Sequence, residues 1–287
     1  MPTRFLIVPQ WQGSSSSRAM QLMDGAAAIA GDLPVSATTT VDVPMEAGES
    51  LGTGVHRLSS IVAVQARTAA ALTELSAIGS GPVVTIGGDC AADLAAVQHA
   101  VSRREPGSLA LVWLDAHGDL NTQETSPSGA FHGMVVRALL GEAPEPLAST
   151  GAAVLSPSSI VLGGTRELDD GEAAFVDEAG IRVIGVDELH TPDALLGAVQ
   201  ATGATAVYVH VDLDVLDPGA IQGVQFPEPF GLQPDELVAA ISALRSRFEL
   251  AGAAITEFAP RTPDASSDDL SVILRVLGAL TRPLPEG

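Results

Sequence analysis

The sequence contains no lysine, and all 14 of its basic residues are arginine. This absence excludes lysine Schiff-base catalysis, pyridoxal phosphate held by a lysine, and a Walker-type phosphate loop. The single cysteine, Cys90, rules out a framework of intrachain disulfides. Aromatic residues make up only 3% of the chain, so Ala, Val, Leu and Ile must fill the core.

The charge balance and the distribution of apolar residues narrow the possible partners. The formal net charge is -21, and phosphate binding needs clustered cations, so we expect no nucleic-acid partner. No apolar run reaches membrane-spanning length without charges or turn residues, so we expect no membrane contact. The first residues, Met1–Phe5, pass straight into a predicted strand and lack a signal peptide's cleavage region. These features predict a cytoplasmic protein that acts on small molecules.

Strand-like apolar runs alternate with longer helical patterns along the 287 residues. Such alternation predicts an α/β fold with a mainly parallel sheet and helices on both faces. No domain boundary is visible, so we expect a single domain over 1–287. The predicted strands lie near 4–8, 34–43, 82–86, 109–114, 159–163, 181–185, 206–211 and 252–256. The predicted helices lie near 16–31, 55–78, 91–102, 132–140, 171–179, 193–202, 234–248 and 267–279.

Two clusters of aspartates follow two of these predicted strands. They are Asp115–Asp119 (DAHGD) and Asp212–Pro218 (DLDVLDP). Open α/β sheets place their sites outside the carboxyl ends of strands, so both clusters are expected at the same edge. Carboxylates gathered there repel one another, and divalent cations would keep them ionised. Imidazole from His117 beside carboxylates suits Mn, Fe, Co, Ni or Zn better than Ca or Mg. We interpret the pair of clusters as a two-metal hydrolytic centre.

A calcium loop is the alternative for the second cluster. Loops of the EF-hand type have Gly at the sixth position and Glu at the twelfth, where this segment has Asp217 and Gly223. Asp217 before Pro218 is better explained as a turn residue whose carboxylate bonds the backbone. A calcium-stabilised structural domain is therefore the weaker interpretation.

Together the two motifs, DAHxD and DxDxxDP, resemble those of the ureohydrolase family, which includes arginase, agmatinase, guanidinobutyrase and formiminoglutamase. The family's Gly-Gly-Asp-His element is represented by Gly87–Cys90, with cysteine in place of histidine. A further family element, a Glu after the last strand, is represented by Glu257. The resemblance covers nearly the whole chain and implies a three-layer αβα sandwich around a parallel eight-stranded sheet. It also implies a homo-oligomer, trimeric or hexameric.

The resemblance implies a role for each motif residue around two Mn²⁺ ions. Asp115 and Asp212 would bridge the ions, and a hydroxide held between them would attack the guanidinium carbon. Glu257 would pair with the guanidinium, His132 would carry the proton to the amine leaving group, and Asp119 could hold the hydroxide. The implied metal ligands are Cys90, Asp115, His117, Asp119, Asp212 and Asp214.

Two loops suggest which guanidine is the substrate. Neutral donors that suit an α-carboxylate are Asn121, Ser126 and Ser128, where arginases hold that group. Acids that suit an α-ammonium are Glu167, Asp169 and Glu172, in a segment that resembles the arginase R-D-x-D-x-G-E element. These groups favour a guanidino amino acid, arginine or Nω-hydroxyarginine, over an agmatine, guanidinobutyrate or formiminoglutamate substrate. The polar run Ser14–Ser17 fits either a flexible connector or a substrate gate.

Cys90 is the main departure from the family pattern. A thiolate there would be a softer ligand than imidazole and would shift the preference from Mn toward Zn, Fe, Co or Ni. Alternatively, the ion at this position is lost and the chain is a catalytically silent metal-binding homologue. Cys90 could also act as an oxidation-sensitive switch. A second departure is Val224–Pro227, which replaces a small hydroxyl-rich turn that shapes the guanidinium pocket in arginases.

Overall fold

A computed structural model of the protein describes residues 3–262 and 267–282. Its centre is an eight-stranded sheet in the order β2-β1-β3-β8-β7-β4-β5-β6, in which every strand pair is parallel. The strands are β1 (Arg4–Val8), β2 (Thr38–Thr40), β3 (Val83–Gly87), β4 (Leu109–Leu114), β5 (Ile160–Gly163), β6 (Arg182–Ile184), β7 (Ala206–Asp212) and β8 (Glu249–Thr256). The parallel sheet with helices on both faces confirms the expected αβα sandwich.

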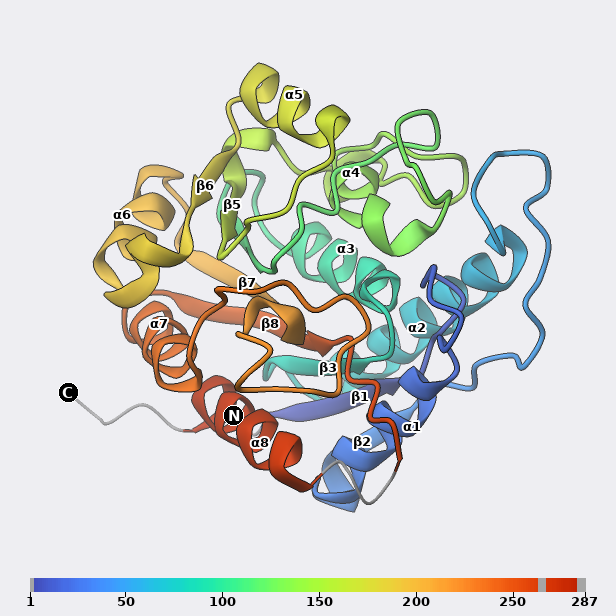
Figure 1. Ribbon diagram of the computed structural model, residues 1–287, viewed down its shortest axis with the longest axis horizontal. Coiled ribbons are helices and arrows are strands. Elements are labelled where there is room, and N and C mark those ends of the chain that lie inside the picture. Colours follow the sequence, from blue (N-terminus) through green and yellow to red (C-terminus); the bar gives the residue numbers. More distant parts are fainter. Residues whose placement is uncertain (1–2, 263–266, 283–287) are drawn as a thin grey trace.

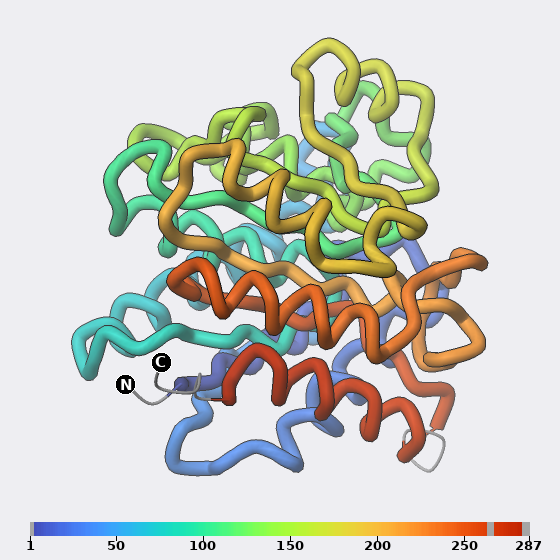
Figure 2. The backbone as a smooth tube through the Cα atoms, turned by 90° about the vertical axis from the view of Figure 1, so that its left-hand side faces the viewer, coloured from blue at the N-terminus to red at the C-terminus, as the bar shows by residue number. Residues whose placement is uncertain are grey.

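Helices cover both faces of the sheet, as Figure 1 shows. They are α1 (Gln21–Gly31), α2 (Leu58–Ile78), α3 (Leu94–Ser102), α4 (Val135–Leu139), α5 (Asp170–Ala179), α6 (Asp193–Ala201), α7 (Pro234–Arg247) and α8 (Ser267–Thr281). Buried side chains of α2, α3 and α4 belong to one core cluster, and those of α6, α7 and α8 to the other. Figure 2 views the molecule from the side of α6, α7 and α8.

The two core clusters follow from the alternation of side chains along each central strand. In β4, Leu111 and Trp113 face one cluster, while Val112 and Leu114 face the other. All six residues of β4 are buried, as expected for a strand of a parallel sheet covered on both faces. The small aliphatic side chains required by the low aromatic content therefore do fill this core.

The predicted strand at 34–43 is much shorter than expected. A 3-10 turn, Val35–Ala37, occupies its start, and only Thr38–Thr40 pair, with β1. This strand lies at the edge of the sheet, where two of its three residues are exposed, so no buried partner extends it. The predicted helix at 16–31 likewise begins later, at Gln21.

The helix α2 has the length and composition of a membrane-spanning segment. In the structure it packs beside α3 and buries Leu58, Ile61, Val64, Leu72 and Leu75 in the core cluster on that face of the sheet. The sandwich itself thus accounts for these five apolar side chains, while Ile78 at the end of the helix is exposed.

The carboxyl ends of the central strands position the candidate site. In the sheet, β3, β8, β7 and β4 are consecutive neighbours. The segments that follow them carry Cys90, Glu257, Asp214 and Asp115, and Asp212 ends β7. Four segments far apart in the sequence therefore meet at one edge, as expected for a parallel sheet.

Candidate active site

One group of possible metal ligands lies at the ends of β3, β4 and β7. Cys90, Asp115, His210 and Asp212 are all buried, and each offers a ligand atom within 4.8 Å of the others. The Cys90 Sγ atom lies 3.1 Å from Asp212 Oδ2. Of these four side chains, His210 was not anticipated from the sequence.

A second group contains Asp115, His117 and Asp214. The Nδ1 atom of His117 lies 3.1 Å from Asp214 Oδ2 and 3.4 Å from Asp115 Oδ1. Both groups include Asp115, so this carboxylate would help to hold either of two neighbouring cations.

Backbone hydrogen bonds fix the acids in this arrangement. The amide of His117 donates to Asp115 Oδ1 at 2.6 Å, and the amide of Asp214 donates to Asp212 Oδ1 at 2.9 Å. The amide of Ala116 donates to Asp214 Oδ1 at 3.2 Å and so ties the two aspartate clusters together. The carboxylates are therefore oriented by backbone amides of these two loops.

Two acids of the site have a buried oxygen atom without a partner. Asp119 Oδ2 and Glu257 Oε2 make no hydrogen bond in the part of the chain that the structure describes. Both residues also have positive φ angles, 50° and 66°, a conformation that costs free energy in non-glycine residues. Buried unpartnered carboxylate oxygens and strained backbone fit a site built for cationic groups, either metals or substrate.

The electrostatics of the cluster agree with this fit. Burial, together with neighbouring carboxylates, raises the pKa values of Asp119, Asp212 and Glu257 well above their usual range. Burial and the same negative field raise the pKa of the Cys90 thiol. Burial opposes protonation of His117, but its hydrogen bonds to the acids prevail and raise its pKa. Without positive charge the cluster therefore retains protons, and divalent cations would replace them.

A histidine and a glutamate flank the acid cluster. His132 Nδ1 lies 3.7 Å from Glu257 Oε1, and Ser15 Oγ lies 3.4 Å from His132 Nε2. The ring of Phe226 lies 5.1 Å from the His132 ring. Burial lowers the pKa of His132 to about 4, so this imidazole is neutral near pH 7. Glu257 Oε1 also accepts the amide of Cys90 at 3.3 Å.

A cavity of about 140 Å³ is lined by residues from both parts of the predicted site. One part of its lining is His117, Asp119, Asp212 and Asp214, and another is Ser15, His132, Gly133 and Phe226. The rest of its lining, called here the outer loop, is Asn121, Ser126, Pro127, Ser128, Asp169 and Glu172. Among the described residues, no arginine lines it.

The outer loop is organised by its own polar groups. Asn121 Nδ2 donates to Asp169 Oδ2 at 2.8 Å. Glu172 accepts the amides of Leu120 and Asp169 and so completes a capping box at the start of α5. Glu167, the remaining predicted substrate residue, is exposed and lies outside the cavity lining.

Sequence reasoning missed His210 and identified two other residues only as parts of segments. Ser15 lies in Ser14–Ser17, for which a substrate gate was one of two alternatives, and Phe226 lies in the altered turn Val224–Pro227; the fold brings both to His132. His210 stands in an apolar strand and looked like core, although its position two residues before Asp212 places it on the same face of β7. That alternation was the available signal.

Comparisons with known proteins agree with the fold and the motifs. A family model described as the arginase family matches residues 10–278. The chain is 31% identical to an arginase of Bacillus caldovelox over 261 residues, 87% of this chain and 83% of the relative. It is 34% identical to an N(omega)-hydroxy-L-arginine amidinohydrolase of Streptomyces lavendulae over 198 residues, 68% of each chain. The solved native structure of the Bacillus caldovelox arginase superposes with a TM-score of 0.85, 26% identity and 99% coverage of both chains. The chain therefore belongs to the arginase family of metal-dependent amidinohydrolases.

Proposed function

We propose that the protein hydrolyses the C–N bond of a guanidino amino acid, arginine or Nω-hydroxyarginine. The products would be urea or hydroxyurea and an amine such as ornithine. The observation that carries the proposal is the single cavity that joins a cluster of acids to a loop of neutral donors and further acids. A cationic guanidinium fits the first end, and an α-carboxylate with an α-ammonium fits the second.

Two divalent cations are part of the proposal. Cys90, Asp115, Asp119 and Asp212 would hold one of them, and Asp115, His117, Asp212 and Asp214 the other. When bound, such ions lower the pKa of a water molecule and supply the nucleophile of hydrolysis. Mn²⁺ suits the ligand set of His117 and carboxylates, whereas the Cys90 thiolate favours Zn²⁺, Fe²⁺, Co²⁺ or Ni²⁺.

Three side chains in and beside the acid cluster have complementary tasks. Glu257 would pair with the planar guanidinium through its unpartnered Oε2 atom, while the Cys90 amide holds its Oε1 atom. Asp119 would accept a hydrogen bond from the attacking water through its own free oxygen. His132, which lies beside Glu257 and whose imidazole is neutral near pH 7, would first accept a proton released by the attacking water and then pass it to the departing amine.

The outer loop would select the amino-acid end of the substrate. Ser126 and Ser128 present hydroxyl groups, and Asn121 an amide, to a carboxylate that no arginine neutralises in the described lining. Asp169 and Glu172 face the same space and would bind the ammonium group. The two named relatives act on arginine or its Nω-hydroxy derivative according to their names, which agrees with this selection.

A panel of four guanidines tests the proposal on metal-reloaded protein. Arginine and Nω-hydroxyarginine carry both charged groups, agmatine lacks the carboxylate, and guanidinobutyrate lacks the ammonium. We expect urea or hydroxyurea chiefly from the first two. Turnover of agmatine or guanidinobutyrate at a higher kcat/KM would overturn the assignment of the outer loop.

The chain offers a matched pair of acids for this test. Asp169→Asn should raise KM for the α-amino substrates about tenfold, as expected for loss of a charged hydrogen bond of about 1.4 kcal/mol or more. Guanidinobutyrate kinetics should not change, because this compound has no ammonium group. Asp170→Asn, the exposed neighbour in the first turn of α5, is the control and should leave both KM values unaltered. Equal effects of the two substitutions would contradict the role of Asp169.

The proposed substrate is a free metabolite, so we place the enzyme in the cytoplasm without a nucleic-acid or membrane partner. Membership of the family supports a homotrimer or homohexamer. Sedimentation of the metal-loaded protein measures the assembly directly, and a monomer would contradict it.

A further inference from the structure

His210 is a buried imidazole whose place follows from the register of the sheet. It is fully buried in β7, on the same face as Asp212. Its cross-strand neighbour in β4 is Trp113, and the two rings stack with centroids 3.4 Å apart and planes 2° apart. The indole Nε1 of Trp113 in turn donates to Asp115 Oδ2 at 3.0 Å. His210 is therefore packed rigidly beside one carboxylate of the candidate metal centre.

A buried carboxylate fixes the orientation of this ring. Asp93 is fully buried in the 3-10 turn Cys90–Asp93, and its Oδ2 lies 2.9 Å from His210 Nδ1. The other oxygen, Oδ1, accepts the hydroxyl of Tyr208. An ionised Asp93 would thus accept one proton from each partner, which places hydrogen on Nδ1 and leaves Nε2 as the nitrogen with a free lone pair.

His210 lies among other electron-pair donors. It belongs with Cys90, Asp115 and Asp212 to the group whose ligand atoms are within 4.8 Å of one another. The hydroxyl of Thr256, 3.3 Å from Nε2, is the neighbouring group that could donate to it. Ligand atoms about 2.0–2.3 Å from a shared zinc ion lie roughly 3–4 Å apart. Cys90 Sγ and Asp212 Oδ2, 3.1 Å apart, already have this separation, and one cation would draw the rest of the group inward from its 4.8 Å limit.

We propose that His210, oriented by Asp93, is a ligand of the metal ion held by Cys90, and replaces the imidazole that the cysteine has removed from that position. The ligand set is then Cys90, His210, Asp115 and Asp212, with His210 in the place given above to Asp119, whose remaining task is to hold the attacking water. This assignment rests on the proposed two-metal hydrolase and identifies a ligand that the sequence motifs do not contain. The Asp93–His210 pair has the carboxylate–histidine–metal arrangement common to histidine ligands.

The assignment makes the two metal positions chemically unlike. One thiolate, one imidazole and two carboxylates form a four-coordinate set that suits zinc or cobalt. The other position, with His117 and carboxylates alone, remains suited to manganese. The protein would therefore take up a mixed pair of ions.

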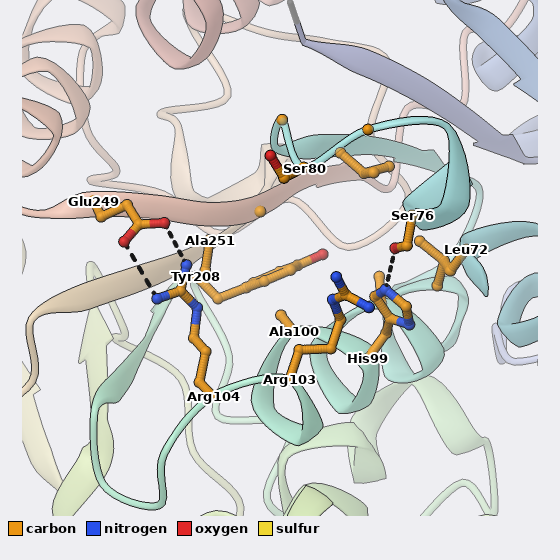
Figure 3. A pocket seen from close by; sticks show the side chains of 15 residues that line it. Leu72, Ser76, Ser80, His99, Ala100, Arg103, Arg104, Tyr208, Glu249 and Ala251 are labelled. Atoms are coloured by element: carbon orange, nitrogen blue, oxygen red, sulfur yellow. Dashed lines mark hydrogen bonds and ion pairs between the residues drawn. The ribbon is translucent and has the colours of Figure 1, made fainter. Parts of the chain in front are cut away.

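The hydrogen-bonded chain from the metal group ends at a second cavity, near the amino ends of the strands. This cavity, about 290 Å³ in volume, is partly walled by Tyr208, with Ser76, His99, Arg104 and Glu249 around it (Figure 3). Arg104 is paired there with Glu249 at 2.6 Å, and His99 with Ser76 at 2.7 Å. No group of possible metal ligands was found here among the described residues, so His99 serves as a control histidine outside the centre.

Zinc X-ray absorption tests the assignment without any assay of activity. His117→Asn protein, which lacks the imidazole of the other position, is loaded with one equivalent of Zn²⁺ per chain. We expect one sulfur and one imidazole in the zinc shell. The further substitution His210→Gln should remove the imidazole signal, whereas His99→Gln should leave it. Asp93→Asn should weaken zinc binding about 10–100-fold while retaining the sulfur signal.

The outcomes separate this inference from the proposed function. A zinc shell with sulfur but no imidazole in the His117→Asn protein would show that His210 is only a core residue. A zinc shell without sulfur would exclude Cys90 as a ligand and, with it, the metal position that Cys90 and His210 are proposed to share. Either result, combined with hydrolysis of arginine by the native protein, would overturn the inference alone. Imidazole and sulfur at zinc, without hydrolysis of any guanidine, would instead overturn the proposed function. The His117→Asn measurement stands by itself if His210→Gln fails to fold.

Discussion

The metal-free protein should lose stability as the pH rises from 5 to 8, because of a buried acid next to Cys90. Asp89 is fully buried, where it accepts the amides of Gly13 and Ala91 at 2.8 and 2.9 Å and the Gln10 side chain at 3.0 Å. These donors favour the carboxylate, but burial outweighs them and raises the pKa of Asp89 from 3.8 to about 7.

The sign and size of the effect follow from this shift. Because the pKa of Asp89 is higher in the folded than in the unfolded protein, the protonated carboxyl stabilises the fold. This contribution is complete below the unfolded-state pKa and is lost as the pH rises through the folded-state pKa. Each pKa unit corresponds to about 1.4 kcal/mol, so ionisation of Asp89 should cost about 3 kcal/mol of unfolding free energy between pH 5 and 8. Asp214, whose pKa burial raises to about 6, acts in the same direction.

Urea unfolding of metal-free protein at several pH values measures this dependence. Asp89→Asn, which cannot ionise, should flatten the profile by about 3 kcal/mol relative to the native sequence. Reloading with metal should reverse the trend, since ligands must be deprotonated to bind cations. A metal-free stability that rises with pH, or an unchanged slope in Asp89→Asn, would refute the reasoning.

Three further substitutions probe the frame and the chemistry of the site. Gly88→Ala would place a Cβ atom against the carbonyl of Gln10. Thermal denaturation should therefore show that the free energy of unfolding falls by about 1–3 kcal/mol, and an unchanged value would mean that the segments of Gly88 and Gln10 move apart freely. His132→Asn should lower kcat by about 10²–10⁴ without changing the metal count, and an unchanged kcat would exclude proton transfer by this residue. The side chain of Arg166 donates to the carbonyls of Gly164, Asp214 and Glu228 and so holds the segment around residue 228 against the site. Arg166→Ala should therefore raise KM and speed proteolysis near residue 228, and an unchanged KM would contradict this role.

The regular parts of the fold were predictable because apolar runs and helical patterns alternate clearly. The central strands β4 and β7 are buried on both faces, so their sequences read as continuous apolar runs. The edge strand was not predictable in extent, since Thr38–Thr40 have little buried surface to mark where pairing ends. The pattern of apolar residues therefore does not predict the ends of a strand where burial no longer constrains the sequence.

The residues of the candidate site likewise include some that the sequence predicts and some that it does not. The acids at the ends of β4 and β7 follow from strand polarity, and the fold brings them within reach of one another. The segments Ser14–Ser17 and Val224–Pro227 drew attention in the sequence, but the contacts of Ser15 and Phe226 with His132 could not be predicted, because both lie in loops without periodicity. His210 escaped notice because a histidine inside an apolar strand resembles core, and only the position of Asp93 reveals its orientation.

The most direct test of the two-metal hydrolytic centre is a combined measurement of metal content and turnover. Protein stripped of metal and reloaded with manganese, with or without one equivalent of zinc, is analysed for metal per chain and for urea or hydroxyurea release. We predict two ions per chain, with hydrolysis of arginine or Nω-hydroxyarginine that is lost on chelation. A folded protein that binds one ion or none and releases no product from any guanidine would contradict the account and favour a silent homologue.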